Sequence, residues 1–203
     1  CSGEPALREA FAAGQDVHAA TAAEVFGVPL EGMPRDVRDR AKAVNFGIIY
    51  GISDFGLSEQ LAISRADARE YIATYLARYP RVEAFVASTI AEATEEGVVT
   101  TLLGRRRAIP ELSARTQQQR QLGERLAVNT VIQGSAADII KIAMIRAHRA
   151  IAESGTGARL VLQIHDELLI ECPPAEVDEV RALTVEAMTG AYALDPPLAV
   201  DVG

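Results

Sequence analysis

Tryptophan is absent from the 203-residue chain, aromatic residues make up only 5% of it, and cysteine occurs twice. Cys1 and Cys172 stand too far apart for the paired spacing of a metal site, and two thiols make no disulfide framework. Two unpaired thiols fit the reducing cytosol. No uninterrupted apolar run approaches about 18 residues, so the sequence predicts no membrane span and no membrane partner.

The chain is also short of positive charge, with a formal net charge of −8. An acidic chain has no overall field that attracts nucleic acid, so any such contact must come from local basic clusters. Hydrophobic residues make up 49% of the sequence and charged residues 24%. That composition is globular, and a chain of this length buries a substantial core in one or two domains.

Apolar residues recur at helical spacing along much of the chain. Gly14 and Gly134 are expected to interrupt helices, Gly27, Gly51 and Gly97 to end them, and Asp36 and Ser64 to cap them. We expect helices at residues 5–26, 38–50, 64–79, 81–96, 115–153 and 174–190.

Two segments rich in β-branched and apolar residues predict hairpins. One covers residues 98–109 around Gly104, and the other covers residues 158–172 with His-Asp-Glu at its tip. A short strand is expected at residues 198–202. Because helices dominate the first part and antiparallel strands mix with helices in the last, the expected fold class is α+β.

Arg38, Lys42, Phe46 and Tyr50 follow one another in steps of four residues. Four residues turn a helix by about 400°, so these side chains form one row about 18 Å long. Cations at its start suit phosphate oxygens, and rings at its end suit a flat base. An amphipathic helix with solvated cations and buried rings fits the same spacing, so spacing alone leaves both interpretations open.

Asp166 and Glu167 are adjacent at the tip of the second expected hairpin. Neighbouring carboxylates repel each other, and a cation that prefers oxygen ligands, such as Mg²⁺, relieves that repulsion. An exposed acidic turn is the alternative, and His165 beside them fits a structural role. A two-metal site needs carboxylates from more than one segment, and the chain offers this one place.

Arg125, Asn129 and Gln133 also stand four residues apart, within one expected helix. Side-chain amides both donate and accept hydrogen bonds, which suits the groove edges of a nucleic-acid duplex. Residues 104–107 read Gly-Arg-Arg-Arg and form a basic cluster that suits backbone phosphate. Solvated helix and loop surfaces explain both features equally well.

Taken together and in order, these segments resemble family A DNA polymerases, the bacterial DNA polymerase I group. RDRAKAVNFGIIYG at residues 38–51 resembles the fingers-helix motif, and LVLQIHDELLIE at residues 160–171 resembles the palm motif. The segments DVHAATAAEVFGVP, TLLGRRRAIPEL and NTVIQGSAADIIKIAMI resemble the intervening family segments. The resemblance covers essentially the whole chain. It implies a right-hand polymerase with a helical fingers subdomain at residues 1–124 and part of an antiparallel-sheet palm at residues 125–203.

The family's reaction is template-directed DNA synthesis in replication and repair, in which a primer 3′-hydroxyl attacks the α-phosphate of a deoxynucleotide with two Mg²⁺ ions. The resemblance implies that Arg38 and Lys42 hold the triphosphate, with His18 at its outer end. It implies that Phe46 packs against the sugar and base and that Tyr50 lies at the templating position. Family members with Tyr in place of Phe46 accept dideoxynucleotides readily, so Phe46 predicts discrimination against them.

In the palm, the resemblance implies that Asp166 is a metal ligand, with Glu167 close by and His165 near the primer terminus. These three residues and Lys42 are the expected catalytic residues. A cytoplasmic, nucleoid-associated location follows from such a function. The residues expected to contact primer–template DNA are Arg125, Asn129, Gln133 and His165.

The sequence also departs from the family's pattern. The other palm motif, with the second metal-binding Asp, and the thumb are missing from these 203 residues. One ligand of the two-metal site is therefore expected from the remainder of a longer polymerase, and the chain alone is expected to be inactive. A fragment that binds nucleotide or DNA without catalysis is the alternative. A single-subunit RNA polymerase is disfavoured by the NFG and IHDE contexts.

Overall fold

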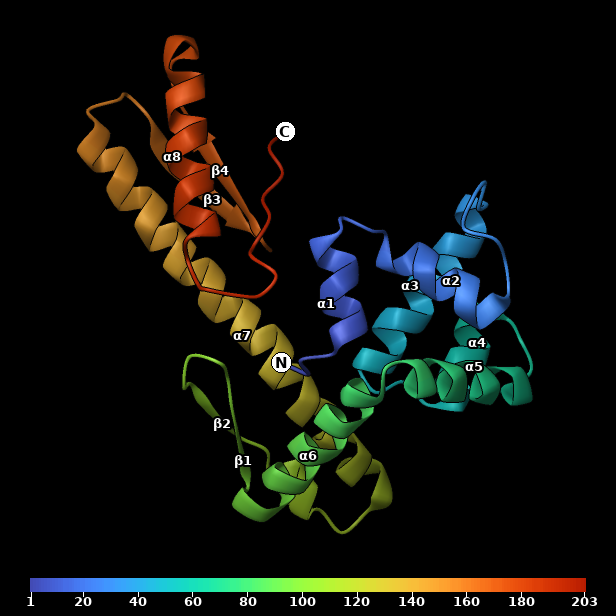
Figure 1. Cartoon of the computed structure of the whole chain (residues 1–203). Coiled ribbons are helices and arrows are strands. Elements are labelled where there is room, and N and C mark those ends of the chain that lie inside the picture. Colours follow the sequence, from blue (N-terminus) through green and yellow to red (C-terminus); the bar gives the residue numbers. More distant parts are fainter. The chain divides into compact units, whose positions relative to one another are not determined.

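The computed structural model describes all residues 1–203, which form two compact units, residues 1–132 and 133–203. The first unit is helical with one small antiparallel sheet, and the second holds helices beside another two-stranded antiparallel sheet (Figure 1). The expected α+β class is confirmed. The boundary between the two units falls within one long helix, as does the boundary expected after residue 124.

The first unit contains six shorter helices, a short hairpin, a 3₁₀ turn and the first part of the long helix. The elements are α1 (Pro5–Ala12), α2 (Val17–Phe26), α3 (Arg35–Ile49), α4 (Asp54–Leu61), α5 (Arg65–Arg78), α6 (Pro80–Glu96), β1 (Val98–Thr100), β2 (Arg106–Ala108), η1 (Pro110–Ser113) and α7 (Gln117–Ser154). The second unit adds β3 (Arg159–Ile164), β4 (Glu167–Glu171), η2 (Pro174–Glu176) and α8 (Val177–Thr189).

The larger core of the first unit lies among α3, α4, α5 and the start of α6. Val44, Ile48, Leu57 and Tyr75 are buried there, and Tyr75 packs edge-on against Tyr79 with ring centroids 4.8 Å apart. Removing apolar area from water stabilises such a cluster by about 25 cal/mol per Å². The buried face of α3 fixes which of its side chains point outward.

Most of the predicted helix limits are confirmed. Gly14 separates α1 from α2, Gly27 ends α2 in the left-handed conformation, and Gly97 ends α6 in the same way. The Ser64 hydroxyl accepts a hydrogen bond from the backbone N–H of Asp67 and caps α5. Glycine serves at such ends because it lacks the Cβ that penalises a positive φ.

Helix α3 begins earlier than predicted, and one helix was missed. Asp36 is not the N-cap, because Pro34 precedes the helix and places Asp36 in its first turn, where a carboxylate favours the helix dipole. The missed helix, α4, is short and contains Gly56, which weakens its periodic signal. The Ser53 hydroxyl caps it by accepting from the Gly56 N–H.

The predicted break at Gly134 is wrong, because α7 runs without interruption from Gln117 to Ser154. A glycine inside a helix costs only about 1 kcal/mol relative to alanine, and burial of other α7 side chains offsets that cost. The strand predicted at residues 198–202 is also wrong. That segment has no regular structure, and the sheet holds only β3 and β4.

Helix α7 is long and apolar enough to cross a membrane, by length and composition only. A core helix passes the same test, and Ala127, Val128, Ala143, Ala147 and Ile151 of α7 are buried in the protein. The helix is therefore weak support for a membrane span.

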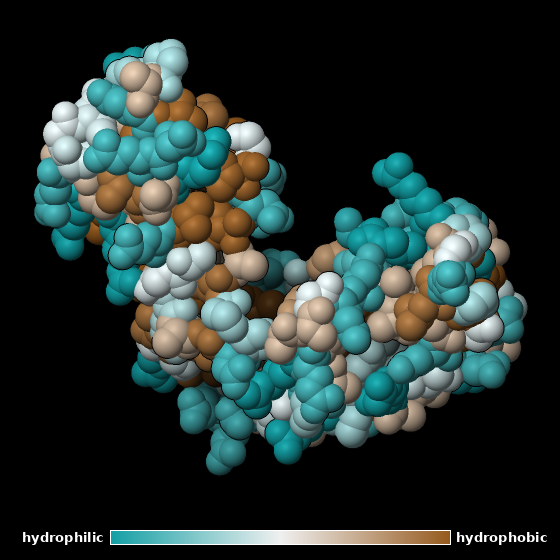
Figure 2. Space-filling model, turned by 45° about the horizontal axis from the view of Figure 1, so that its top comes forward, coloured by the Kyte–Doolittle hydropathy of each residue, from teal (hydrophilic) through white to brown (hydrophobic).

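In the second unit, β3 and β4 form the predicted hairpin, with Arg159 opposite Glu171 at the open end and Ile164 opposite Glu167 beside the turn. Several apolar side chains of this hairpin remain on the surface, and Figure 2 shows apolar surface gathered on the part of the molecule that carries α8 and this hairpin. The exposed ones include Val161, Leu162, Ile164 and Leu169, each about half exposed.

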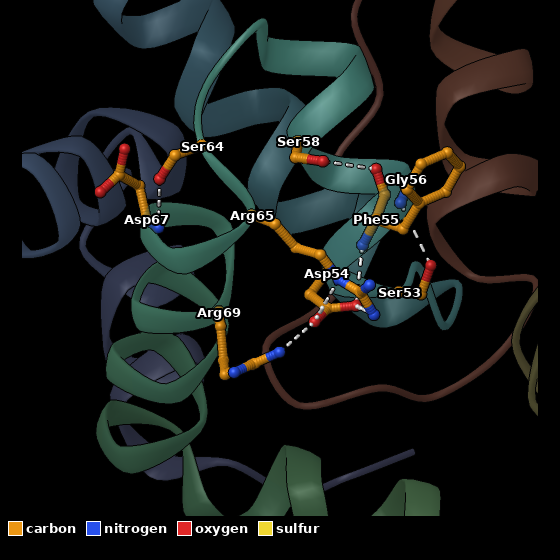
Figure 3. A network of polar contacts seen from close by, with 9 residues as sticks. All are labelled: Ser53, Asp54, Phe55, Gly56, Ser58, Ser64, Arg65, Asp67 and Arg69. Atoms are coloured by element: carbon orange, nitrogen blue, oxygen red, sulfur yellow. Dashed lines mark hydrogen bonds and ion pairs between the residues drawn. The ribbon is translucent and has the colours of Figure 1, made fainter.

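An ion-pair cluster ties the start of α4 to α5 (Figure 3). The Asp54 carboxylate accepts hydrogen bonds from Arg65 at 3.0 and 3.1 Å and from Arg69 at 2.9 Å. The Asp54 side chain is 19% exposed, whereas both arginines are well exposed. The two guanidinium groups lower the pKa of Asp54 from 3.8 to about 2, because hydrogen bonds from Arg65 and then Arg69 favour the charged form.

We expect Asp54→Asn to remove a pH-dependent part of the stability. Because the folded pKa lies below the unfolded value, the stabilisation is present above about pH 4 and is lost as the pH falls toward about 2. The variant should therefore melt below the wild type at about pH 6, and the two melting temperatures should converge by about pH 2 in thermal unfolding followed by circular dichroism. Glu59→Gln, an exposed change on the same helix, is the control. A constant difference at every pH would contradict the assignment.

Candidate functional site

The predicted row of cations and rings lies on the outer face of α3. Ala41, Val44, Asn45 and Ile48 of α3 are buried, which turns the opposite face of the helix to the surface. Phe46 is 42% exposed there. The interpretation in which the rings of the row are sealed in the core therefore fails for Phe46.

The ring contacts bring the predicted nucleotide-binding side chains together. Phe46 stacks on Tyr50 with centroids 6.1 Å apart and an interplanar angle of 8°, and His18 of α2 meets the Phe46 ring at 5.5 Å. The Lys42 ammonium lies 5.9 Å from the centroid of the Phe46 ring. Helices α2 and α3 thus place one imidazole, one ammonium and one parallel tyrosine ring around the ring of Phe46.

Arg38, at the N-terminal end of the row, forms an ion pair with Asp16, the residue that caps α2. The distance from Arg38 Nε to Asp16 Oδ2 is 2.5 Å, and Asp16 Oδ1 accepts from the backbone N–H groups of His18 and Ala19. The hydrogen bond from Arg38 is the main cause of the lowered pKa of Asp16. Sequence reasoning missed Asp16, although the pattern of an Asp two residues before His18 marks it as a helix cap.

His18 is held in a polar contact on its inner side. Its Nδ1 lies 2.9 Å from Nδ2 of Asn45, a buried residue of α3. The pKa of His18 is lowered, chiefly by burial; the Asp16 carboxylate opposes the shift, and the charges of Arg38 and Lys42 add to it. A pKa below the usual value of 6.5 keeps the imidazole neutral near neutral pH.

Arg125 lies beside the end of the row. Gly51, which follows Tyr50, has a φ of +74°, and a Cβ added there would lie 3.1 Å from Cγ of Arg125. These residues line a hollow of about 270 Å³, together with Val86 and Glu124. The structure therefore joins Arg125 to the C-terminal end of α3, a proximity that no sequence pattern indicated.

Arg125, Asn129 and Gln133 all belong to the uninterrupted helix α7. Their spacing of four residues places them along one side of the helix. The side-chain Oδ1 of Asn129 is buried without a hydrogen-bond partner within the chain. A buried acceptor without a partner costs stability, and its burial keeps this oxygen away from the surface. Gln133 is the first residue of the second unit.

The basic cluster at residues 104–107 has a structural contact. The Arg107 guanidinium donates through Nη1 to the Thr130 hydroxyl on α7 at 2.8 Å. Arg107 therefore ties β2 to α7, and Arg106 beside it on β2 is exposed.

In the second unit, His165 and Asp166 form the two-residue turn between β3 and β4. His165 has a φ of +54°, which is uncommon for a residue with a side chain, and its carbonyl accepts from Gln163 Nε2 at 2.7 Å. Asp166 and Glu167 are exposed and line a hollow of about 690 Å³ that also includes Asp201. A backbone outlier beside two carboxylates is the kind of position found at functional sites.

The carboxylates of Asp166 and Glu167 fit part of a metal site. Carboxylate oxygens are the ligands that Mg²⁺ prefers. No group of three or more His, Cys, Asp or Glu side chains in residues 1–203 is arranged to hold a metal ion. These residues therefore supply one side of such a site, and further ligands would have to come from another segment.

One unit thus carries a cationic and aromatic row, and the other carries a hairpin with an acidic tip. The chain belongs to DNA polymerase family A, whose family model matches residues 1–203. The resemblance found in the sequence is thereby confirmed, and membership of this family implies a divalent metal cofactor.

Within the family, the chain is similar to bacterial DNA polymerase I. It is 46% identical over 202 residues to DNA polymerase I of Mycobacterium tuberculosis, and 48% identical over 197 residues to that of Pseudomonas aeruginosa. These alignments cover 100% and 97% of the chain. The chain spans 22% of the length of each relative.

The fold is similar to that of the POL domain of Pol1 from M. smegmatis, which was solved in complex with DNA primer-template and dNTP. The TM-score is 0.95 and the sequence identity 42%, and the match covers 100% of this chain and 36% of that one.

Proposed function

We propose that this chain forms the fingers and part of the palm of a DNA polymerase that extends a primer with deoxynucleotides on a DNA template, in replication and repair. One observation carries the proposal: the His18 and Tyr50 rings and the Lys42 ammonium gather around the exposed Phe46 ring on two packed helices, with Arg38 on the same face. Cations, a neutral imidazole and parallel rings along one row match the parts of a nucleoside triphosphate.

The proposed roles of the row follow from its chemistry. Lys42 and Arg38 neutralise phosphate oxygens, Lys42 as a compact charge and Arg38 as a planar fork of donors. Arg38 is paired with Asp16 here, so the triphosphate would compete with that carboxylate for the guanidinium. The exposed face of Phe46 packs against sugar and base, and Tyr50, stacked upon it, covers the templating position.

At the hairpin tip, Asp166 is the proposed metal ligand, with Glu167 beside it and His165 near the primer terminus. Mg²⁺, when bound, would lower the pKa of the primer 3′-hydroxyl and neutralise charge that develops on the α-phosphate. The exposed Asp166 carboxylate supplies an oxygen ligand, and the fixed turn at His165 holds it in place.

We assign contacts with the primer–template duplex to Arg125, Asn129 and Gln133. Arg125 beside Gly51 supplies a cation close to the proposed templating position. Asn129 and Gln133 both carry side-chain amides, whose groups can donate and accept hydrogen bonds. Minor-groove edges present a nearly sequence-independent pattern, which suits an enzyme that must copy any template.

The remainder of a longer polymerase is the proposed partner of the second unit. It would bring the second palm carboxylate to Asp166 and cover the apolar side chains that β3 and β4 leave exposed. An exposed apolar patch of this kind is typical of a surface that another segment covers. A protein that copies chromosomal DNA would act in the cytoplasm, at the nucleoid.

Primer extension tests the proposed function. We expect the complete protein to extend a primer on a DNA template in the presence of Mg²⁺ and all four deoxynucleotides, and the 203-residue chain alone to give no extension because its metal site is incomplete. The same complete protein with EDTA is the control.

Failure of the complete protein would favour the second candidate, a module that binds nucleotide or DNA without catalysis. Extension by the chain alone would instead contradict the proposed need for a second carboxylate segment. A fluorescent deoxynucleotide distinguishes two reasons for inactivity of the chain alone. Binding indicates a folded nucleotide site that lacks metal ligands, and no binding indicates that the chain has no nucleotide site.

A further inference from the structure

Behind the exposed row, a series of polar contacts leads from Thr21 through Asn45 to His18, and the proposed reaction gives no role to its two inner members. The Thr21 hydroxyl of α2 lies 3.0 Å from Oδ1 of Asn45 on α3, and Nδ2 of Asn45 lies 2.9 Å from Nδ1 of His18. Thr21 is fully buried and Asn45 is 3% exposed. Because buried polar groups are costly unless paired, each of these contacts is strongly constrained.

The direction of the hydrogen bond between Asn45 and His18 follows from the orientation of the Asn45 amide. The Thr21 hydroxyl lies 3.0 Å from Asn45 Oδ1 and 2.9 Å from the Val17 carbonyl oxygen, and these two acceptors share its single proton. In the structure the Asn45 amide presents Nδ2, which can only donate, to His18. Nδ1 of His18 must then accept, which leaves the single proton of a neutral imidazole on Nε2.

The charges around His18 favour the neutral ring. Burial is the main cause of the lowered pKa of His18; the carboxylate of Asp16, which caps α2, opposes the shift, and the charges of Arg38 and Lys42 on α3 add to it. The Phe46 ring covers another side of the imidazole at 5.5 Å. A neutral imidazole can still donate one hydrogen bond, provided that the proton is on the outward nitrogen.

We propose that Asn45 is a positioning residue that holds His18 in the tautomer with the proton on Nε2, so that this N–H donates to the outer phosphate oxygens of the incoming nucleotide. This inference rests on the proposed nucleotide-binding role of the row. Asn45 itself is buried and does not touch the nucleotide, so its effect passes through His18 alone. The opposite tautomer would present a lone pair to the phosphates and repel them.

The tautomer can be measured without any polymerase activity. The chain contains only three histidines, so ¹⁵N-histidine labelling and long-range ¹H–¹⁵N correlation spectra give a small set of signals, and His18→Gln identifies the one sought. We expect the His18 signal to show a protonated Nε2 and a bare Nδ1 at a pH about one unit above its pKa. A protonated Nδ1 would overturn the inference, whether or not the protein polymerises.

The isosteric variant Asn45→Asp should reverse the direction of the hydrogen bond between the side chain of residue 45 and Nδ1 of His18. An Asp carboxylate can only accept, so it favours a proton on Nδ1 and should raise the pKa of His18 in the same spectra. An unchanged His18 titration in a folded variant contradicts the inference. If Asn45→Asp does not fold, Thr21→Val removes the hydroxyl that orients the amide, and the preference for Nε2–H must then weaken.

A double-mutant cycle in the complete polymerase tests the nucleotide contact. We expect Asn45→Asp to raise KM for deoxynucleotide about 5- to 10-fold, the effect of one hydrogen bond, with a smaller change in kcat. In a His18→Gln background the same substitution should change KM little, because Asn45 acts through His18. Equal, additive effects in both backgrounds would reject the positioning role, and the spectra would still report the tautomer.

Discussion

Replacement of Asp166 by Asn in the complete polymerase is expected to lower kcat about 10³-fold or more, since metal stabilisation of the transition state is worth several kcal/mol. Asn keeps the size and turn preference of Asp but removes the charge that holds a divalent cation. Asp166 is exposed at a hairpin turn, so the substitution should leave the fold intact. Single-turnover primer extension at saturating deoxynucleotide measures the loss directly.

The control for this substitution is Asp201→Asn. Asp201 lines the same hollow as Asp166 and is also exposed, but it has no proposed contact with metal or substrate. It should leave kcat within about twofold, as surface substitutions outside a site usually do. If both variants lost kcat to a similar extent, activity would depend on the total negative charge around the hollow. Asp166 would then not be a specific metal ligand.

Phe46→Tyr in the complete polymerase is expected to relax discrimination against dideoxynucleotides about 10- to 100-fold, the range that one or two buried hydrogen bonds supply. The added hydroxyl offers a polar contact at the sugar, and this replaces the contact that a missing 3′-hydroxyl would have made. Phe46 is exposed beside Tyr50 and His18, so the hydroxyl has room without disturbing the core. Competition between deoxy- and dideoxynucleotides in primer extension gives the ratio.

Tyr50→Phe is the matched control, because it removes a hydroxyl from the stacked neighbouring ring. It should leave the dideoxynucleotide ratio unchanged, since Tyr50 is assigned to the templating position and not to the sugar. An unchanged ratio in the Phe46→Tyr variant would show that Phe46 does not contact the sugar, and the role assigned to Phe46 would be wrong.

The sequence predicted those parts of the fold whose signals are local. Gly97 ends α6 and Ser64 caps α5, because a left-handed C-terminus and a hydroxyl cap need particular residues. The hairpin with Asp166 at its turn followed from two apolar runs around a polar tip. Family resemblance supplied the roles, which periodicity alone left open.

Other features depend on tertiary packing and carry no local signal. The low helix propensity of Gly134 predicted a break in the helix, but the burial of other α7 side chains outweighs that cost and α7 is continuous. Residues 198–202 have an apolar pattern yet no strand partner, and a strand forms only when its backbone is paired. Asp16 and Asn45 entered the site through contacts between helices far apart in sequence, which spacing cannot reveal.

The half-exposed apolar side chains of β3 and β4 have a practical consequence. A two-stranded ribbon has open edges on both sides, and such edges invite pairing with other copies, especially when apolar. Concentrated preparations of the 203-residue chain should therefore self-associate through this ribbon, so spectra and binding curves are best recorded in dilute solution. Replacing Leu169 with lysine would place a charged gatekeeper on the ribbon and improve handling without touching the nucleotide row.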